Sequence, residues 1–211
     1  MSQGGTNISG VDTQALFNRV LRVAQLDTSV FEEVKNDAAG TIPSIIVAAV
    51  AVVVASLGGL LWWVVNDGND TGEFLVRSVI LGSAFAVALW FAWVGVTYVL
   101  LTQIFKATAD FQSLVRTMGL AAVPLVLMFL MFVPALDFSL ALAAVGLWVT
   151  TTTLAVQAST SASPGQTLLA TAAGFLVWAV VLGLLAGADT DSAPLAPGIF
   201  VFDWLEELIV G

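Results

Sequence analysis

The sequence contains no cysteine and no histidine. Without cysteine the chain forms no disulfide and has no thiolate nucleophile. Without histidine it lacks the usual imidazole base and the commonest ligand of transition metals. Basic residues are scarce too, because four arginines and two lysines are spread along 211 residues and form no cluster that binds phosphate backbones. We therefore expect no bound metal or cofactor and no nucleic-acid partner.

Arrangements of residues that support catalysis are also missing. The acidic pairs Glu32 with Glu33 and Glu206 with Glu207 are adjacent in sequence, so on a helix their side chains diverge by about 100°. The sequence contains no glycine motif that cradles phosphate and no acidic set with metal-ligand spacing. It therefore predicts a protein that is not an enzyme and has no catalytic residue.

The charge that is present is mostly negative. Acidic residues outnumber basic ones by 15 to 6, which gives a net charge of −9 and a pI of about 4.1. In molar salt the Debye length falls to about 3 Å, so repulsion between such acids costs little. The composition favours a halophilic source, such as a haloarchaeon; an ordinary acidic protein is the alternative.

Long apolar stretches dominate what remains. Hydrophobic residues make up 59% of the chain, and its mean hydropathy is +0.99. Five stretches carry no Asp, Glu, Lys or Arg, and each has about the 20 residues that a helix needs to cross a bilayer. We predict an all-α fold, a multi-pass bundle of five transmembrane helices over residues 42–65, 78–105, 117–136, 138–157 and 166–187.

This layout divides the chain into three regions. An amino-terminal tail (1–41) precedes the transmembrane domain (42–187), and an acidic tail (188–211) follows it. Within the domain, Pro134 to Asp137 interrupt a long apolar run, so we predict a tight hairpin between the third and fourth spans. In the last tail, residues 199–210 predict an amphipathic helix at the membrane interface.

The amino-terminal tail predicts two short helices. The first begins at Asp12 or Thr13, where apolar residues start to recur at helical spacing. The second starts near Asp27, where Ser29 and Glu32 match a capping box, and ends at Gly40. Both helices either lie in the membrane surface or pack on the bundle.

The distribution of basic residues predicts the orientation. With a cytoplasmic amino terminus, five of the six basic residues fall inside and only Arg77 falls outside. The five are Arg19, Arg22, Lys35, Lys106 and Arg116. An odd number of spans then places the carboxy terminus outside the cell.

Polar residues within the spans are neutral. Arg77, Lys106, Arg116 and Asp137 fall at predicted span ends. Because intramembrane charge marks proton and ion pathways, we do not expect a proton-coupled carrier. The four threonines at 150–153 either line a polar pathway or bond to their own helix backbone.

Small residues spaced four apart predict seams where helices pack closely. One stripe lies on the second span and one on the fifth, and each forms a seam within the bundle or between copies of it. The stripes are Ala84, Ala88 and Ala92, and Ala179, Gly183 and Gly187.

Two segments carry a family resemblance. Residues 30–41 (VFEEVKNDAAGT) precede the first span, and residues 111–124 form a basic loop that runs into a Gly-x-x-x-x-Pro span start. Both resemble the Yip family, the Ypt/Rab-interacting membrane proteins; the matching residues of the second segment are Phe111, Arg116, Gly119 and Pro124. The resemblance implies five spans and a non-enzymatic role, which in eukaryotes lies in vesicle traffic beside small GTPases. The acidic, lysine-poor surface suggests a prokaryote, in which Rab partners are not expected.

Taken together, the residues predict a protein that organises membrane or partner proteins. Arg19 and Arg22 are expected to meet anionic lipid headgroups, and the seams to bind a membrane-protein partner or a second copy. One alternative is a transporter or channel for a small neutral solute, with residues 150–153 and Gln157 facing a cavity. Another is an accessory subunit of a larger membrane complex.

Overall fold

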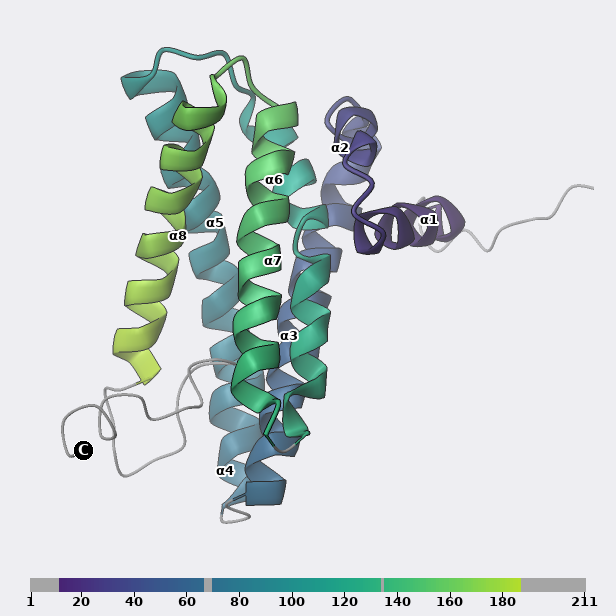
Figure 1. The fold of residues 1–211 in the computed structure, drawn as a ribbon, viewed down its shortest axis with the longest axis vertical. Helices are drawn as coiled ribbons and strands as arrows, with labels where there is room; N and C mark the ends of the chain where they lie inside the picture. The colour runs from purple at the N-terminus through teal and green to yellow at the C-terminus, as the bar shows by residue number, and fades with distance from the viewer. Residues whose placement is uncertain (1–11, 67–69, 134, 187–211) are drawn as a thin grey trace, which may run out of the picture.

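The computed structural model describes residues 12–66, 70–133 and 135–186. Five helical segments in this part are long and apolar enough to cross a membrane, and they stand side by side as a bundle (Figure 1). This confirms the predicted all-α fold and a multi-pass membrane protein. The five segments are Ala38–Asn66, Thr71–Ile104, Phe111–Phe132, Asp137–Ala158 and Pro164–Ala186. The tails 1–11 and 187–211, including the helix predicted at 199–210, lie outside the described residues.

Three spans are built from one main α-helix each, and two are composite. The first, fourth and fifth contain α3 (Thr41–Asn66), α7 (Asp137–Ala158) and α8 (Pro164–Ala186). The second and third join several pieces in sequence. These are α4 (Thr71–Phe74), the π-helical η2 (Leu75–Gly82), α5 (Ser83–Val99) and the π-helical η3 (Leu100–Ile104), then α6 (Phe111–Leu120) and the 3₁₀-helical η4 (Val123–Phe132).

Two spans begin six or seven residues earlier than hydropathy predicted. The second helix begins at Thr71 rather than at residue 78, and the third at Phe111 rather than at residue 117. The added turns contain charge: Arg77 pairs with Glu73 four residues away, and the Asp110 carboxylate accepts from the Ser113 N–H at 2.7 Å. Such residues extend a helix beyond the hydrocarbon, and a search for uncharged apolar runs does not detect these added turns.

The third span is broken and packs mainly between the first and fourth spans. Its α-helix ends at Leu120, and after a turn the chain continues as η4, with Pro124 in the opening turn. A 3₁₀ residue rises about 2.0 Å against 1.5 Å in an α-helix, so the ten residues of η4 cover about 20 Å. This span is also the most enclosed, since 72% of its most apolar window is buried against 28–44% in the others.

Glycines allow the backbones of neighbouring spans to touch. A Cβ at Gly58 of α3 would collide with the Met128 carbonyl and lie 2.7 Å from the Phe129 Cα in η4. A Cβ at Gly119 would lie 2.6 Å from the Ser44 carbonyl oxygen in α3. The first and third spans therefore meet at two points without room for a side chain, as close packing in lipid requires. A third such contact sets Gly174 of α8 against Trp93 of α5.

The predicted small-residue stripes lie elsewhere. Ala84, Ala88 and Ala92 are all exposed, so their stripe is not a seam within the chain, and that part of the prediction is wrong. The face was misassigned because both sides of a lipid-facing helix are apolar. In the fifth span Ala179 and Gly183 are half-buried, and Gly187 lies outside the described residues. Contact between copies through either stripe stays a prediction.

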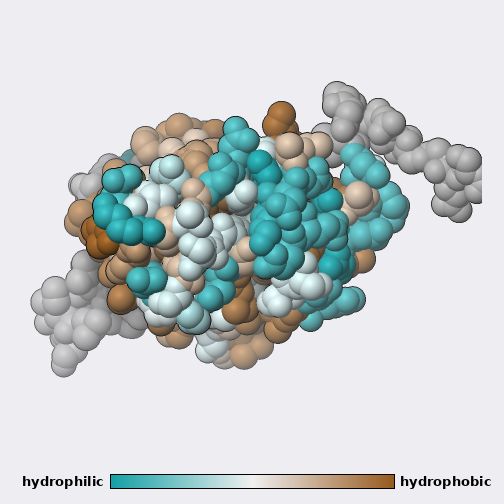
Figure 2. All heavy atoms as spheres, turned by 90° about the horizontal axis from the view of Figure 1, so that it is seen from above, coloured by the Kyte–Doolittle hydropathy of each residue, from teal (hydrophilic) through white to brown (hydrophobic). Residues whose placement is uncertain are grey.

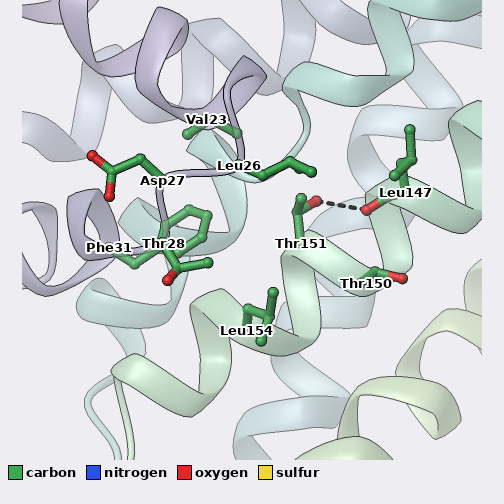
Figure 3. Close-up of a pocket in the computed structure, with 9 residues that line it drawn as sticks. All are labelled: Val23, Leu26, Asp27, Thr28, Phe31, Leu147, Thr150, Thr151 and Leu154. Carbon is green, nitrogen blue, oxygen red and sulfur yellow. Dashed lines mark hydrogen bonds between the residues drawn. The ribbon is translucent and has the colours of Figure 1, made fainter.

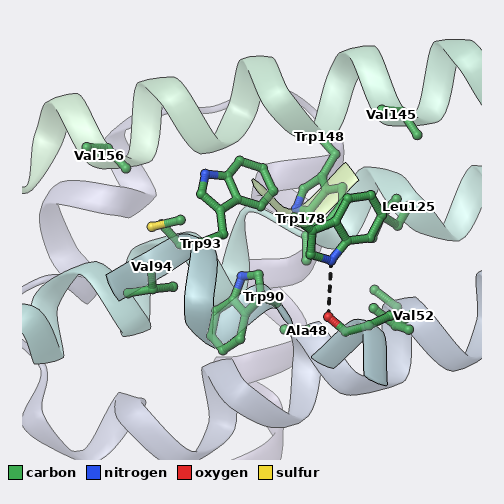
Figure 4. Close-up of a cluster of buried hydrophobic side chains, with 14 of the residues drawn as sticks. Ala48, Val52, Trp90, Trp93, Val94, Leu125, Val145, Trp148, Val156 and Trp178 are labelled. Atoms are coloured by element: carbon green, nitrogen blue, oxygen red, sulfur yellow. Dashed lines mark hydrogen bonds between the residues drawn. The ribbon is translucent and has the colours of Figure 1, made fainter. Parts of the chain in front are cut away.

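Tryptophans fill the space between α5, α7 and α8. The ring of Trp148 lies edge-on between Trp93 and Trp178, with centroids at 4.9 and 5.0 Å (Figure 4). The Trp93 indole N–H donates to the Thr171 carbonyl at 2.9 Å, and that of Trp178 to the Ala86 carbonyl at 3.1 Å. Paired aromatic rings contribute about 0.5–1.5 kcal/mol beyond their burial, so this cluster holds the second, fourth and fifth spans together.

The hairpin predicted between the third and fourth spans is confirmed. Helix η4 ends at Phe132 and α7 begins at Asp137. The carboxylate of Asp137 accepts a hydrogen bond from the Trp62 indole N–H at 2.9 Å, which ties this turn to the end of α3.

Candidate functional site

The amino-terminal segment forms two helices that fold back on each other. Helix α1 (Thr13–Ala24) and helix α2 (Ser29–Val34) are followed by the 3₁₀ turn η1 (Ala38–Gly40), which leads into α3. The Asp12 carboxylate caps α1 by accepting from the Gln14 and Ala15 N–H groups, both at 3.1 Å. The two predicted helices are therefore present, although the second ends at Val34 rather than at Gly40. Helix α1 runs across the direction of the spans (Figure 1). We call α1, α2, their connection and the following residues 35–37 the amino-terminal hairpin.

The connection between α1 and α2 holds a leucine in an unusual conformation. Leu26 follows the end of α1 with a φ of 61°. Its N–H donates to the Val23 carbonyl and that of Asp27 to the Arg22 carbonyl, both at 2.9 Å, which is the Schellman arrangement. Glycine usually occupies this left-handed position, and a bulky residue there is a genuine outlier. The leucine side chain is nonetheless 59% exposed.

The cap of α2 differs from the predicted capping box. The Ser29 N–H donates to the Asp27 carboxylate at 3.0 Å, and the Ser29 hydroxyl also donates to it. The residue that flanks α2, Thr28, has no side-chain cap. The capping-box prediction is wrong because Asp27 lies nearer than Glu32 to the first free N–H groups of the helix.

One side of the hairpin packs on the bundle and another faces outward. Val23, Phe31 and Val34 are buried in a cluster with Leu120 and Ala155 of the third and fourth spans. This favours packing on the bundle over a helix that rests on the membrane alone. Yet Phe17 and Leu21, one turn apart on α1, are 58% and 42% exposed. An apolar face of α1 is therefore left open beside the spans.

Both arginines of α1 are paired with carboxylates of the hairpin. Arg19 contacts Glu33 at 3.1 Å and Asp37 at 2.8 Å, while Arg22 contacts Asp27 at 2.8 Å and Glu33 at 2.7 Å. Two guanidinium groups thus meet three carboxylates, and the cluster carries no excess positive charge. Contact of Arg19 and Arg22 with anionic headgroups stays a prediction, and both arginines have closer partners within the chain.

Acid should loosen the contact between α1 and α2. Hydrogen bonds from Ser29 and Arg22 lower the pKa of Asp27 from 3.8 to about 2, and the pKa of Glu33 is lowered mainly by Arg22. A carboxylate with a lowered folded pKa stabilises the folded state above its unfolded pKa. That stabilisation is lost as the pH falls through the pKa of the folded state. We therefore expect the contact between α1 and α2 to loosen between about pH 4 and pH 2.

A spin label at Gln25→Cys should report this loosening as increased mobility over that range. The same label at Leu169→Cys on α8 is the control and should not respond. Mobility that changes between neutral pH and about pH 5, or that stays constant down to about pH 2, would contradict the role of these two carboxylates.

Arg116 is the residue that anchors the hairpin to the third span. Its guanidinium donates to the Thr41 hydroxyl at 2.9 Å, to the Gln112 side chain at 3.4 Å and to the Lys35 carbonyl. The Ser113 hydroxyl donates to the same Lys35 carbonyl at 3.0 Å, so two residues of α6 meet at this atom. Arg116 is only 6% exposed. Arg116 was predicted at a span end, and the structure buries it there because the hairpin covers it.

The other residues of the predicted family-like motif serve packing. Phe111 begins α6 and meets the Tyr98 ring edge-on at 5.7 Å. Gly119 is the close contact with Ser44, and buried Pro124 opens η4 after the break in the third span. Sequence reasoning missed Lys35 as the partner of Arg116, since the two residues are 81 positions apart.

Three of the four consecutive threonines bond to backbone. Thr150 and Thr153 each donate to the carbonyl four residues earlier at 2.8 Å, and Thr151 also reaches the Ala121 carbonyl at 2.9 Å, at the break in the third span. The hydroxyl of Thr152 is buried with no hydrogen-bond partner among the described residues. Within this part of the chain the threonines therefore bond mainly to the backbone of their own helix, and Thr151 also joins α7 to the third span.

Hydrophilic residues gather at the end of the bundle that bears the hairpin, and hydrophobic surface surrounds them (Figure 2). This end also carries the ion pairs of Arg19 and Arg22. Comparison of the chain with protein-family models, curated proteins and solved structures finds no match.

Proposed function

We propose that this chain is a non-enzymatic integral membrane protein that organises the membrane, or partner proteins within it, as the Yip family that it resembles does. The observation that carries the proposal is the exposed apolar face of α1. Phe17 and Leu21 are exposed on a helix that runs across the direction of the spans at one side of the bundle, where hydrocarbon would surround those spans. An amphipathic helix so placed inserts its apolar side at the boundary between headgroups and acyl chains.

The contact with lipid is apolar rather than electrostatic in this proposal. The carboxylates of Asp27, Glu33 and Asp37 neutralise the charges of Arg19 and Arg22. Electrostatic attraction of an anionic headgroup to these arginines therefore contributes little binding free energy. An apolar contact also persists in concentrated salt, which suits the halophilic source that the composition favours.

The location that we propose is the cell membrane, with the amino terminus in the cytoplasm. Lys35 and Arg116 lie together at the end that bears the hairpin, whereas Arg77 lies in η2 near the other end of the second span. The positive-inside rule then assigns the hairpin to the cytoplasmic side. Helix α8 ends at the opposite end of the bundle (Figure 1).

Site-directed spin labelling tests the proposed contact. Because the chain has no cysteine, a single substitution gives one labelled position. In vesicles, labels at Phe17→Cys and Leu21→Cys should be accessible to oxygen and shielded from a water-soluble nickel chelate. The exposed Asn36→Cys after α2 is the control and should show the reverse. Labels at Phe17 that are as open to the chelate as those at Asn36 would refute the proposal.

A transporter or channel for a small neutral solute is the second candidate. The break in the third span favours it, because discontinuous helices form the solute sites of many transporters. Buried hydroxyls of Thr152, Thr167 and Thr171 without partners among the described residues also favour it. Solute flux into liposomes that is lost in Thr152→Val, with the fold kept, would favour this candidate over the first.

A further inference from the structure

A small pocket lies between the amino-terminal hairpin and the fourth span. Its volume is about 120 Å³, and Figure 3 shows residues of the α1–α2 connection on one side and of α7 on the other. The hairpin side is formed by Val23, Leu26, Asp27, Thr28 and Phe31, and the α7 side by Leu147, Thr150, Thr151 and Leu154. For comparison, an apolar cavity of about 150 Å³ stays dry and binds a molecule as small as benzene.

The walls of this pocket offer little to a polar ligand. The hydroxyls of Thr150 and Thr151 donate to backbone carbonyls of their own helix. The Asp27 carboxylate is engaged by Arg22 and Ser29, and in Figure 3 it points away from α7. Apart from the hydroxyl of Thr28, the remaining lining is aliphatic or aromatic, so the ligand that fits is mainly a hydrocarbon.

The depth of the pocket places it among acyl chains. Leu154 and Leu147 precede the end of α7 at Ala158 by four and eleven residues. At about 1.5 Å a residue, they lie about 6 and 16 Å from that end, between that end and about the middle of a hydrocarbon layer about 30 Å thick. Both leucines are exposed, at 42% and 36%, so the pocket opens toward lipid.

Leu26 provides a second, independent indication. Its backbone is held in the left-handed conformation, which costs a non-glycine residue about 1 kcal/mol or more. Glycine or asparagine would avoid this cost. The leucine instead places an exposed apolar side chain at the pocket, as expected of a residue kept for contact rather than for stability.

We propose that this pocket holds part of one phospholipid acyl chain, with Leu26 and Leu154 against it. The proposal rests on the membrane contact proposed above and names its ligand. A chain held there would fix a lipid beside α1 and would join the hairpin to α7 through the lipid.

Photolabelling tests the site. The full chain is reconstituted in phosphatidylcholine vesicles with a trace of phosphatidylcholine that carries a diazirine on one acyl chain. Labelling should concentrate on peptides that contain Leu26 or residues 147–154. Leu154→Trp fills the pocket and should lower this labelling about tenfold, the factor that loss of about two methylene contacts gives. The control Leu184→Trp, at a 70% exposed position on α8, should leave it unchanged.

Leu26→Asn gives a separate readout, since asparagine suits the left-handed backbone. It should raise the unfolding temperature while it lowers the labelling of residues 147–154. The site would be overturned if residues 147–154 were labelled no more strongly than α8, or if Leu154→Trp left their labelling unchanged. Lipid adducts that link to a second copy of the chain, or that form on residues 1–11, would also overturn it. The accessibility of the Phe17 label separates the two proposals. If that label is shielded from the nickel chelate but the pocket is not photolabelled, only the acyl-chain site is refuted and the membrane contact of α1 stands.

Discussion

Gly58→Ala should prevent tight packing of the first span on the third and lower stability by about 3 kcal/mol, at the upper end of what overpacking costs. The added Cβ would collide with the Met128 carbonyl and the Phe129 backbone. These are main-chain atoms of η4, so no side-chain rotation can relieve the clash. Thermal unfolding of purified protein, followed by the fluorescence of its tryptophans, measures the effect.

The chain offers a matched control for this substitution. Gly95 of α5 and Gly146 of α7 are also helical, and a Cβ at either would meet nothing within 4 Å. Alanine at these positions should leave stability unchanged or raise it by up to about 1 kcal/mol through helix propensity. Equal unfolding temperatures for Gly58→Ala and Gly95→Ala would show that the first and third spans do not pack as described.

Arg116→Met should detach the hairpin from the third span. Methionine keeps much of the length of the side chain but removes every donor to Thr41, Gln112 and the Lys35 carbonyl. Hydrogen bonds to a charged group contribute about 1.5–3 kcal/mol each, so we expect docking to weaken by about 2 kcal/mol or more. Limited proteolysis should then cut residues 35–41 much faster than in the original chain, while the spans remain protected.

The control for charge loss is Arg77→Met in the second span. Its ion pair with Glu73 joins side chains that are 26% and 40% exposed, and such pairs contribute about 1 kcal/mol or less. Cleavage at residues 35–41 should therefore match that of the original chain. An Arg116→Met protein with the same cleavage rate would mean that the buried apolar side of the hairpin holds it without Arg116.

Elements along the chain were predictable, because local composition determines them. Five spans follow from runs without charge, and the helices that begin near Asp12 and Asp27 follow from apolar spacing. The turn at Pro134 to Asp137 follows from a proline and an isolated acid. Span limits were less accurate, since Glu73 and Asp110 extend helices into polar surroundings.

Contacts between elements were not predictable from the same patterns. In a soluble helix the polar face marks the outside, but a lipid-facing helix is apolar all round. Ala84, which is exposed, and Gly174, which touches Trp93, therefore look alike in the sequence. The burial of Arg116 depends on Lys35, 81 residues away, and the pairing of Arg19 depends on a reversal of the chain at Leu26, where residue preference favours glycine.

The position of the third span between the first and the fourth has a consequence for how the protein is made. This span packs against α3, which is synthesised before it, and against α7, which is synthesised after it. When α6 and η4 first leave the ribosome, the Ala121 carbonyl at their junction still lacks its bond from Thr151. The break in the third span is therefore shielded only after the fourth span has been synthesised, so we expect the two spans to enter the bilayer as a pair.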